Sequence, residues 1–289
     1  MLIQPYELEE LRFAYCIRVY YRWRTHRSSF QSALSRLDRE TLDSLLREYG
    51  IHVLEASASE TDVKVLTSLL PTETVAACAS KMKGRVSKWL RGQSNLPPER
   101  KRLGRGYFAC TTGTTTTQAV MPYLESQGEH HGYMSRPHPP VFVASYPRTP
   151  EDEQRLGTSH AVAVLQFHIV LPTWRRNGVF GRQEAEATAD CWRQIQREYP
   201  LFIEKVSFVP DHVHLAVRTH PSLSPAKVVV AMMNASQNLM WKDFANSVIR
   251  ARVERLWQPG AYIGSYGVLE SVKIAAYVRK WEAADEDHL

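Results

Sequence analysis

The feature that most constrains this chain is an internal repeat. A shift of 150 residues aligns Arg47-Glu48-Tyr49 with Arg197-Glu198-Tyr199, and the register holds without gaps over residues 30–71 and 180–221. Two copies of one unit must fold into similar domains, because the same pattern of apolar and polar positions specifies the same local structure. The repeat therefore favours two modest domains over one large one.

The alignment continues beyond the gapless region at a shift of 154. Gly113 and Gly267 each stand ten residues before a tyrosine, Tyr123 in the first copy and Tyr277 in the second. This second anchor extends the repeat to the end of each copy, and the copies are separated by a proline-rich segment.

The copies differ where polar chemistry is concentrated. The second copy contains Asp-His-Val-His-Leu at 211–215, and the places of His212 and His214 are taken by Asp62 and Lys64 in the first copy. Conversely, Gln127 lies four residues after Tyr123, whereas the second copy has a tryptophan there, Trp281. Each copy keeps groups that the other has lost.

Alternation and helical spacing predict the same element order in both copies: strand, helix, strand, strand, helix, strand, helix. The predicted strands are 13–21, 51–58, 62–69 and 106–112 in the first copy, and 161–171, 201–208, 211–218 and 260–266 in the second. The predicted helices are 36–48, 73–91 and 115–127, and then 183–199, 224–246 and 268–284. A βαββαβ order with short connections predicts an α+β fold with antiparallel sheets, of the ferredoxin-like or RRM-like class, and the final helix carries the tyrosine.

Three segments follow from this pattern. We expect a first domain over residues 1–131, a proline-rich linker over 132–158 and a second domain over 159–289. The first domain is expected to be degenerate and to supply the tyrosine helix, and the second to supply the histidines.

Composition limits the functional class. The chain has 289 residues, 44% of them hydrophobic, and a formal net charge of +6, which suits a polyanionic partner. The four cysteines show no CxxC spacing, which argues against a zinc knuckle or a disulfide framework. No long apolar run or signal-like start is present, so we expect a cytoplasmic protein without a membrane partner.

Basic residues cluster beside aromatic rings, a combination typical of surfaces that hold single-stranded nucleic acid. The predicted nucleic-acid contacts are Arg22, Arg24, Lys83, Arg85, Lys88, Arg91, His168, Arg175 and Arg176. His168 has the alternative interpretation of a core histidine.

The histidine pair and the helical tyrosine suggest chemistry when they are taken together. On a strand, residues i and i+2 share a face, so His212 and His214 can bind one divalent ion, although a structural role explains such a pair equally well. On a helix, Tyr123 and Gln127 are neighbours at i and i+4, and a core role is the ordinary alternative for the tyrosine. A phenolate near a cation can attack a phosphodiester and hold the cleaved strand covalently.

These residues resemble a known family. Asp-His-Val-His-Leu, the segment Arg255-Leu256-Trp257-Gln258-Pro259-Gly260, Gly267 and a helical tyrosine look like the one-tyrosine HUH transposases of the insertion-sequence 200/605 type. The first copy is similar at Thr111-Thr112-Gly113 and at Tyr123-Leu124-Glu125-Ser126-Gln127. Family members are single-domain proteins that act as dimers, so this chain resembles such a dimer fused into one polypeptide.

The resemblance implies roles for particular residues. It assigns His212, His214 and Gln127 as ligands of Mg²⁺ or Mn²⁺, and Tyr123 as the nucleophile, with Tyr277 as a second candidate. It implies a 5′-phosphotyrosine intermediate, a single-stranded DNA substrate with a hairpin or subterminal palindrome, and action at the bacterial nucleoid by a monomeric pseudodimer. Imidazole ligands also admit zinc or nickel. The alternative function is a domesticated, non-catalytic protein that binds hairpin DNA.

Overall fold

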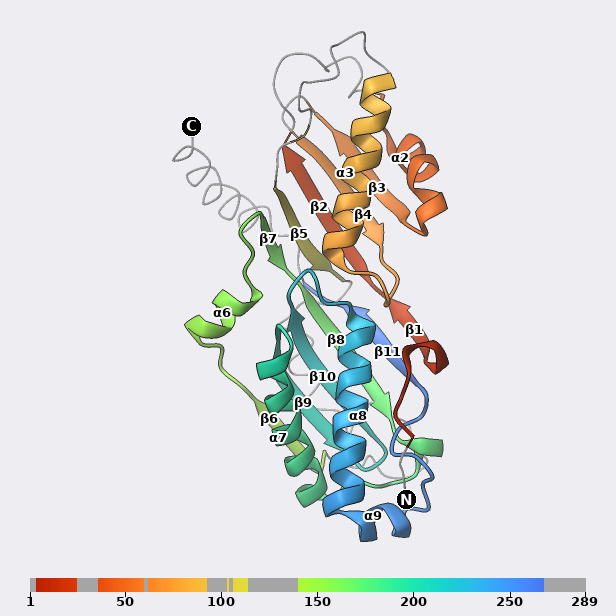
Figure 1. Cartoon of the computed structure of the whole chain (residues 1–289), viewed down its shortest axis with the longest axis vertical. Helices are drawn as coiled ribbons and strands as arrows, with labels where there is room; N and C mark the ends of the chain where they lie inside the picture. Colours follow the sequence, from red (N-terminus) through yellow and green to blue (C-terminus); the bar gives the residue numbers. More distant parts are fainter. Residues whose placement is uncertain are drawn as a thin grey trace.

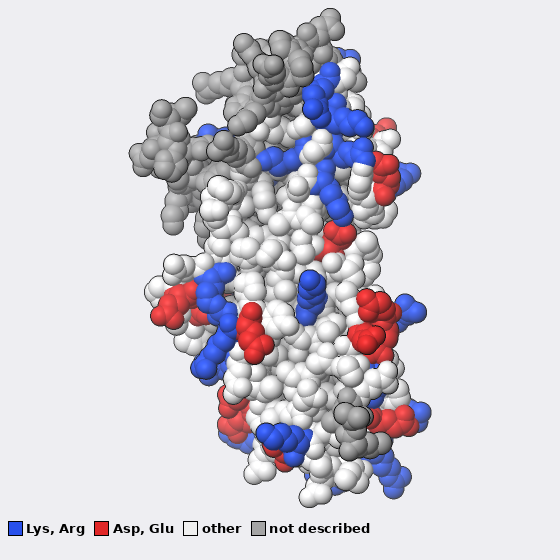
Figure 2. All heavy atoms as spheres, viewed as in Figure 1, with Lys and Arg blue, Asp and Glu red and all other residues white. Residues whose placement is uncertain are grey.

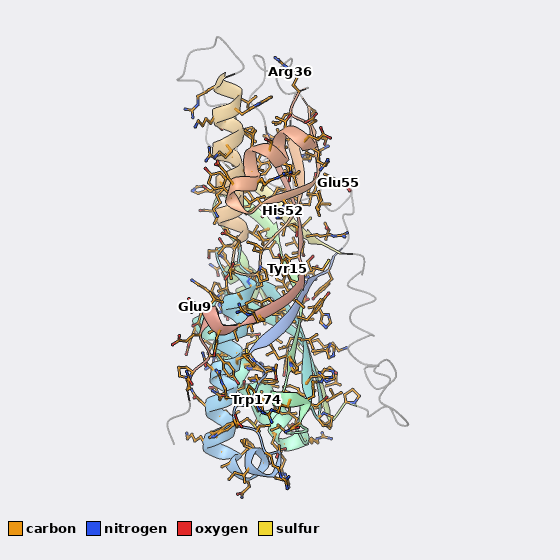
Figure 3. All side chains as sticks on the ribbon, turned by 90° about the vertical axis from the view of Figure 1, so that its right-hand side faces the viewer. Glu9, Tyr15, Arg36, His52, Glu55 and Trp174 are labelled. Carbon is orange, nitrogen blue, oxygen red and sulfur yellow. The ribbon has the colours of Figure 1, made fainter. Side chains whose placement is uncertain are left out.

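The computed structural model describes residues 4–24, 36–59, 62–92, 103, 106–113 and 140–267. Two β-sheets lie end to end along an elongated molecule, and helices cover both of them (Figure 1). The side view in Figure 3 shows these helices on the same side of both sheets and places Tyr15 near the middle of the long axis. This arrangement of helices and antiparallel-rich sheets confirms the predicted α+β class and its two tandem units.

The first sheet has the strand order β3-β4-β2-β5-β7. Its strands are β2 (Arg18–Arg24), β3 (His52–Ala58), β4 (Asp62–Ser68), β5 (Tyr107–Thr112) and β7 (Ala161–Val164). It is covered by α2 (Arg39–Leu46), which continues into the 3-10 turn η2 (Arg47–Tyr49), and by α3 (Val75–Gly92). Helix α2 begins after Asp38, whose carboxylate accepts a hydrogen bond from the Thr41 backbone N–H at 2.8 Å and so caps the first turn.

The second sheet has the order β1-β11-β8-β10-β9-β6. Its strands are β1 (Arg12–Cys16), β6 (Phe142–Ser145), β8 (Gln166–Pro172), β9 (Leu201–Val209), β10 (His212–Thr219) and β11 (Gly260–Ser265). The helices of this half are η1 (Leu8–Glu10), α6 (Pro150–Leu156), η3 (Trp174–Arg176), α7 (Arg182–Glu198), α8 (Pro225–Asp243) and α9 (Ala245–Arg250). Helix α8 begins with Ser224 as its cap and proline at its first position, where the missing N–H costs no helical hydrogen bond.

Each sheet ends in a strand from the other copy. Strand β1 pairs in parallel with β11, and β7 pairs in parallel with β5. The sequence predicted single strands at 13–21 and 161–171, but each of these runs divides at a buried apolar residue, Ile17 or Leu165, and its two halves join different sheets. The exchange is reciprocal, and one continuous hydrophobic core extends through both sheets.

Hydrogen bonds between the copies come in matched pairs. The backbone N–H of Ala76 donates to the carbonyl of Pro221, and 150 residues further on Ala226 donates to Pro71, both at 2.9 Å. The N–H of Arg18 donates to Ser265 Oγ at 2.8 Å, and the N–H of Gln166 donates to Thr111 Oγ1 at 2.9 Å. Such reciprocity is what an isologous contact between two copies requires. The chain is therefore built like a two-fold dimer.

The paired glycines of the repeat lie at this crossing. A Cβ atom on Gly113 would approach the carbonyl oxygen of Ser265 to 2.5 Å, and one on Gly267 would approach that of Thr111 to 2.8 Å. Gly267 also has a φ of +130°, which L side chains rarely adopt. Both positions require glycine because backbone from the other copy passes directly against them.

The two copies share an irregularity as well. The register of β3 against β4 shifts between Val53 and Glu55, and β9 has the same bulge between Ile203 and Lys205. The extra residues, Leu54 and Glu204, are 150 positions apart. A bulge bends its strand and increases the local twist, so its recurrence indicates that the copies bend alike.

The expected linker at 132–158 is described from residue 140 onward, and there it is structured. Residues Phe142–Ser145 form β6, which pairs antiparallel with β9 at the edge of the second sheet. Thr149 caps α6, with Pro150 at its first position. Proline indicated a linker because it interrupts sheets, yet β6 is an edge strand four residues long and lies between the prolines.

Two smaller expectations also differ from the structure. The predicted helix over 36–48 begins only at Arg39 and changes from α-helix to the 3-10 turn η2 after Leu46, and the predicted helix over 224–246 divides into α8 and α9 near Phe244. The predicted helices over 115–127 and 268–284 lie outside the described residues. Within the part of the chain that is described, no helix is long and apolar enough to cross a bilayer.

Aromatic side chains dominate the core of the second half. The Trp192 ring stacks against Phe208 at a centroid distance of 5.4 Å, and Trp257 lies 6.1 Å from Trp192. Both indole N–H groups are satisfied, Trp192 by the carbonyl of Met232 and Trp257 by Ser236 Oγ. The buried indoles, with their N–H groups hydrogen-bonded to α8, therefore pack β9 firmly against α7 and α8.

Candidate metal and DNA-binding site

The predicted histidine pair lies on β10, the strand between β8 and β9. Val213, Leu215 and Val217 are fully buried on the strand face that contributes to the core. His212 and His214 alternate with them and therefore project from the opposite face, with ring centroids 4.9 Å apart. Both imidazoles are buried. A paired central strand fixes their backbone, so the two rings are held as a unit.

The Nδ1 atom of His212 contacts a carboxylate. It lies 2.7 Å from Asp211 Oδ1, and the other oxygen of Asp211 lies 3.0 Å from Arg176 Nε. A carboxylate held by an arginine accepts from Nδ1–H, which leaves the ring lone pair on Nε2. This carboxylate–histidine arrangement is typical of metal-binding imidazoles.

His214 has a second histidine as its neighbour. Its Nδ1 lies 2.9 Å from Nε2 of His168 on β8, and the rings stack with centroids 5.2 Å apart. Burial lowers the pKa of His168 to about 4, so this ring is neutral near pH 7 and accepts a hydrogen bond when His214 donates from Nδ1. In that tautomer Nε2 of His214 carries the lone pair that a cation needs.

The tautomers of both histidines therefore fit metal ligation through Nε2. Among the described residues, no group of three or more histidine, cysteine, aspartate or glutamate side chains is arranged to hold an ion. A site built on His212 and His214 thus needs at least one further ligand of another type or from another part of the chain. An amide oxygen meets that need. Gln127, the predicted third ligand, lies outside the described residues, as do both candidate nucleophiles, Tyr123 and Tyr277.

The turn that carries Arg176 has an unusual backbone. Arg175 and Arg176 have φ angles of 52° and 59°, in the left-handed region that side chains other than glycine seldom adopt. The strain directs Arg176 to Asp211, while the Arg175 guanidinium lies 5.8 Å from the centroid of the Trp174 ring. The sequence predicted both arginines as DNA contacts, and the structure gives Arg176 an additional role in holding the carboxylate behind His212.

The equivalent position in the first copy holds an ion cluster instead. Asp62 is buried on β4, and its Oδ2 atom accepts from Arg22 Nη2 at 2.7 Å and from Arg22 Nε at 3.1 Å. The ammonium of Lys64 lies 3.6 Å from Asp62 Oδ1. Two cations around one carboxylate repel a divalent ion, so this position does not suit a metal and its charges are used in internal ion pairs. Arg22 was predicted to contact DNA, and much of its hydrogen-bonding capacity is directed to Asp62.

The pseudo-symmetry also identifies the residues around each site. Tyr20 in the first copy packs edge-to-face on Phe108 at 6.3 Å, and in the second copy His168 packs in the same way on Tyr262 at 6.1 Å. The first copy thus has a tyrosine–phenylalanine pair where the second has a histidine–tyrosine pair beside His212 and His214. The sequence did not reveal this, because the shift that relates Tyr20 to His168 is 148 and not 150.

The remaining predicted DNA contacts lie mainly on α3. Figure 2 shows Lys and Arg side chains gathered over this helix, whereas few lie over α8. Lys88 and Arg91 are exposed there, and Lys83 is half-buried with its ammonium donating to the carbonyl of Gly106 at 3.3 Å. Arg85 forms an ion pair with Glu48 at 2.6 Å and lies over the Tyr49 ring. Arg24, the last predicted contact, ends β2.

Comparison with known proteins gives a family. The model of the family described as "Transposase IS200 like" matches residues 13–127 and again residues 161–281. These two matches cover more than half of the chain and coincide with its two copies. The chain belongs to the IS200-like transposase family, and it contains that family's domain twice. The resemblance inferred from the motifs is thereby confirmed.

Other comparisons are more distant. A solved structure of a putative transposase from Deinococcus radiodurans R1 is 25% identical, covers 43% of this chain and 95% of its own length, and has a TM-score of 0.35. A mutant chlorite dismutase from Candidatus Nitrospira defluvii is 11% identical over 88% of this chain and 93% of its own, with a TM-score of 0.19. Neither superposition is close enough to support a conclusion. No curated protein matches the sequence.

Proposed function

We propose that this transposase nicks single-stranded DNA and rejoins it through a 5′-phosphotyrosine bond, with one composite active site in each chain. The observation that carries the proposal is the arrangement behind the second-copy histidines, in which Asp211 and His168 contact the two Nδ1 atoms. Contacts of this kind orient imidazoles for a cation. The first copy keeps none of this at Asp62 and Lys64.

His212, His214 and Gln127 would hold Mg²⁺ or Mn²⁺, which, when bound, withdraws charge from a non-bridging phosphate oxygen. Tyr123 supplies the nucleophile. Its phenolate oxygen attacks phosphorus, the bond from phosphorus to the 3′ oxygen breaks, and that oxygen leaves as a 3′ hydroxyl after taking up a proton. The 5′ end is then joined to Tyr123, and the reverse attack by a new 3′ hydroxyl transfers the strand.

The division of groups between copies supports a composite site. Tyr123 and Gln127 stand together in the first copy, and the histidines stand in the second. The reciprocal strand exchange and the matched hydrogen bonds hold the two halves in one body, so a site assembled from both needs no second chain. Tyr277 lacks a glutamine four residues later, which favours Tyr123.

A second function has a specific observation in its favour. The compact ion cluster of Arg22, Asp62 and Lys64 indicates that one of two ancestral sites has lost catalysis, and a domesticated protein that only binds hairpin DNA would have lost the other as well. The retained His212 and His214 with their supporting contacts argue against that interpretation.

A covalent-capture experiment tests the proposed function. The chain is incubated with labelled single-stranded DNA that folds into a hairpin, with Mg²⁺, and separated under denaturing conditions. A labelled protein band that disappears in Tyr123→Phe and persists in Tyr277→Phe supports the proposal. Hairpin binding without any covalent band under these conditions supports the non-catalytic alternative.

A further inference from the structure

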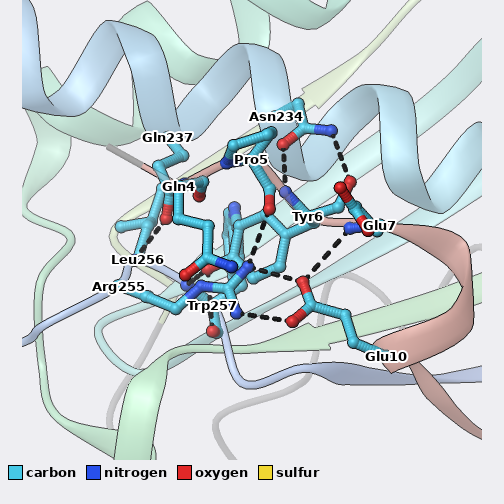
Figure 4. Close-up of polar contacts among 10 residues, drawn as sticks. All are labelled: Gln4, Pro5, Tyr6, Glu7, Glu10, Asn234, Gln237, Arg255, Leu256 and Trp257. Carbon is cyan, nitrogen blue, oxygen red and sulfur yellow. Dashed lines mark hydrogen bonds and ion pairs between the residues drawn. The ribbon is translucent and has the colours of Figure 1, made fainter. Parts of the chain in front are cut away.

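The N-terminal arm, defined as residues 4–11, lies along helix α8 and is held by its side chains (Figure 4). Asn234 accepts from the backbone N–H of Tyr6 at 2.7 Å and donates to the carbonyl of Tyr6 at 3.0 Å. Gln237, one turn further on, donates to the carbonyl of Gln4 at 2.9 Å. Side chains of α8 thus hold the main chain of the arm through hydrogen bonds.

Tyr6 anchors the arm. Its hydroxyl donates to the carbonyl of Trp257 at 2.8 Å and accepts from the backbone N–H of the same residue at 2.7 Å. The Arg255 guanidinium lies 3.9 Å from the centroid of the Tyr6 ring and forms an ion pair with Glu10 at 2.6 Å. A buried side chain with both hydrogen bonds satisfied and a cation over its ring holds the arm firmly in place.

The corresponding surface of the first copy lies on α3, and it lacks the side chains that make these contacts. A shift of 150 places Gly84 and Ser87 of α3 at the positions of Asn234 and Gln237. The amide side chains that hold the arm are therefore missing from α3. At this point the surface contains a cavity of about 380 Å³, lined by Ala76, Ser80, Lys83, Gly84, Ser87 and Tyr107.

The chain segment that corresponds to the arm is engaged elsewhere. The shift of 148 that relates Ile17 to Leu165 takes the arm to residues 152–159, which begin within α6. There Arg155 donates to the carbonyl of Tyr199, between α7 and β9, and so holds α6 beside the second sheet. We define the α3 groove as the six residues that line this cavity. It corresponds to the surface of α8 that binds the arm, but the segment equivalent to the arm lies beside the second sheet instead.

The chemistry of the α3 groove has changed together with its shape. Lys83 stands where the second copy has Met233, Ser80 where it has Val230, and Tyr107 where it has Ala261. Three apolar positions of the second copy thus carry a hydroxyl, an ammonium and a phenol in the first, and Ser87 adds a second hydroxyl. Exposed Lys88 and Arg91 lie on the same helix. Groups of this kind bind phosphodiesters through charge and hydrogen bonds.

We propose that the α3 groove binds the sugar–phosphate backbone of the DNA substrate, and that the N-terminal arm closes the equivalent surface on α8, so that each chain holds one DNA hairpin and not two. The inference rests on the proposed function in taking hairpin-forming DNA as the substrate, but not on cleavage. The two copies then have different roles in the pseudodimer, because the first supplies the DNA-binding groove and the second supplies the histidines.

The test measures binding without metal, so that cleavage plays no part. A fluorescein-labelled single strand that forms one stem-loop is titrated with wild-type protein and with Gly84→Glu, and the stoichiometry is read by native mass spectrometry. Gly92→Glu is the matched control, because both glycines lie on α3 with open space where a Cβ atom would stand, and the charge change is the same. We expect one DNA per chain, and a loss of affinity on the order of tenfold for Gly84→Glu but not for Gly92→Glu.

A salt titration distinguishes groove binding from a general effect of charge. Lys83→Gln should reduce the slope of log affinity against log salt by about 0.9, whereas Lys227→Gln, at an exposed position on α8, should leave it unchanged. Two DNA molecules per chain, equal effects of the two glutamates, or no DNA binding at all would overturn the inference. Binding as expected with no covalent product in Mg²⁺ would overturn the proposed function alone.

Discussion

Nε2 of His168 lies 2.9 Å from Nδ1 of His214, although the residues belong to different strands and were not linked by any motif. The contact orients one of the two proposed metal ligands from behind. Because burial holds the pKa of His168 near 4, the ring stays neutral and can act as an acceptor across the physiological range. His168 is therefore a positioning residue for the candidate site.

Replacing His168 should weaken metal binding without removing a ligand. We expect His168→Ala to lower Mn²⁺ affinity by about 10- to 100-fold, the usual effect of losing a partner behind a metal-binding imidazole. His168→Gln should recover part of the loss, because its amide oxygen can still accept from Nδ1. Mn²⁺ titration followed by electron paramagnetic resonance measures this directly, and equal affinity in wild type and His168→Ala would contradict the role.

Removing a ligand should separate cleavage from binding. His212→Ala is expected to abolish nicking of a hairpin-bearing single strand and to leave its affinity for that strand nearly unchanged, since phosphate contacts provide most of the binding energy. Chelation of divalent ions should have the same effect on the wild type. Nicking that persists in His212→Ala or in excess chelator would show that the reaction does not use this site.

The crossing between the copies should tolerate no side chain at Gly113. A Cβ there would lie 2.5 Å from the Ser265 carbonyl oxygen, so Gly113→Ala should destabilise the fold by about 2 kcal/mol or more. Gly84→Ala is the control, because it meets open space within α3 and should stabilise the helix by about 0.5–1 kcal/mol. Urea denaturation of the two variants gives the comparison, and similar stabilities would show that the copies do not pack as described.

The ion pair between Glu10 and Arg255, which helps to hold the N-terminal arm, should depend on pH. The hydrogen bonds that Glu10 accepts from Arg255 lower the pKa of its carboxyl group. The contribution of the pair to the free energy of unfolding is therefore present above the pKa of Glu10 in the unfolded state, and it is lost as the pH falls through the lower folded-state value. Glu10→Gln should cost less than about 1 kcal/mol at pH 7, and the difference from wild type should vanish in acid. Unfolding measured at both pH values tests this, and a difference that persists in acid would assign the effect to packing.

Much of the fold could be predicted from the repeat. Alternation on β10 correctly placed His212 and His214 on the face opposite Val213, and the shared register indicated matching elements in the two copies. The exchange of β1 and β7 was not predictable, because an apolar strand carries no local signal of which sheet it joins. The break at Ile17 is a single buried residue within a continuous run of strand-forming residues.

The supporting contacts of the site were equally hidden. Asp211 precedes His212 in a turn and gave no sign that Arg176 would reach it through a left-handed backbone. The structured segment at 142–145 was obscured by the prolines around it, and the contact between Tyr6 and Asn234 joins residues 228 positions apart. These features depend on contacts between residues far apart in the sequence, which patterns within one segment do not encode.

The two copies are proposed to form one active site, with the nucleophile from the first and the histidines from the second. The most direct measurement is to trap the covalent complex with Mg²⁺, digest the DNA and the protein, and identify by mass spectrometry which tyrosine carries the residual nucleotide. We predict that it is Tyr123. A nucleotide on Tyr277 would show instead that the second copy acts alone, and the composite site would be wrong.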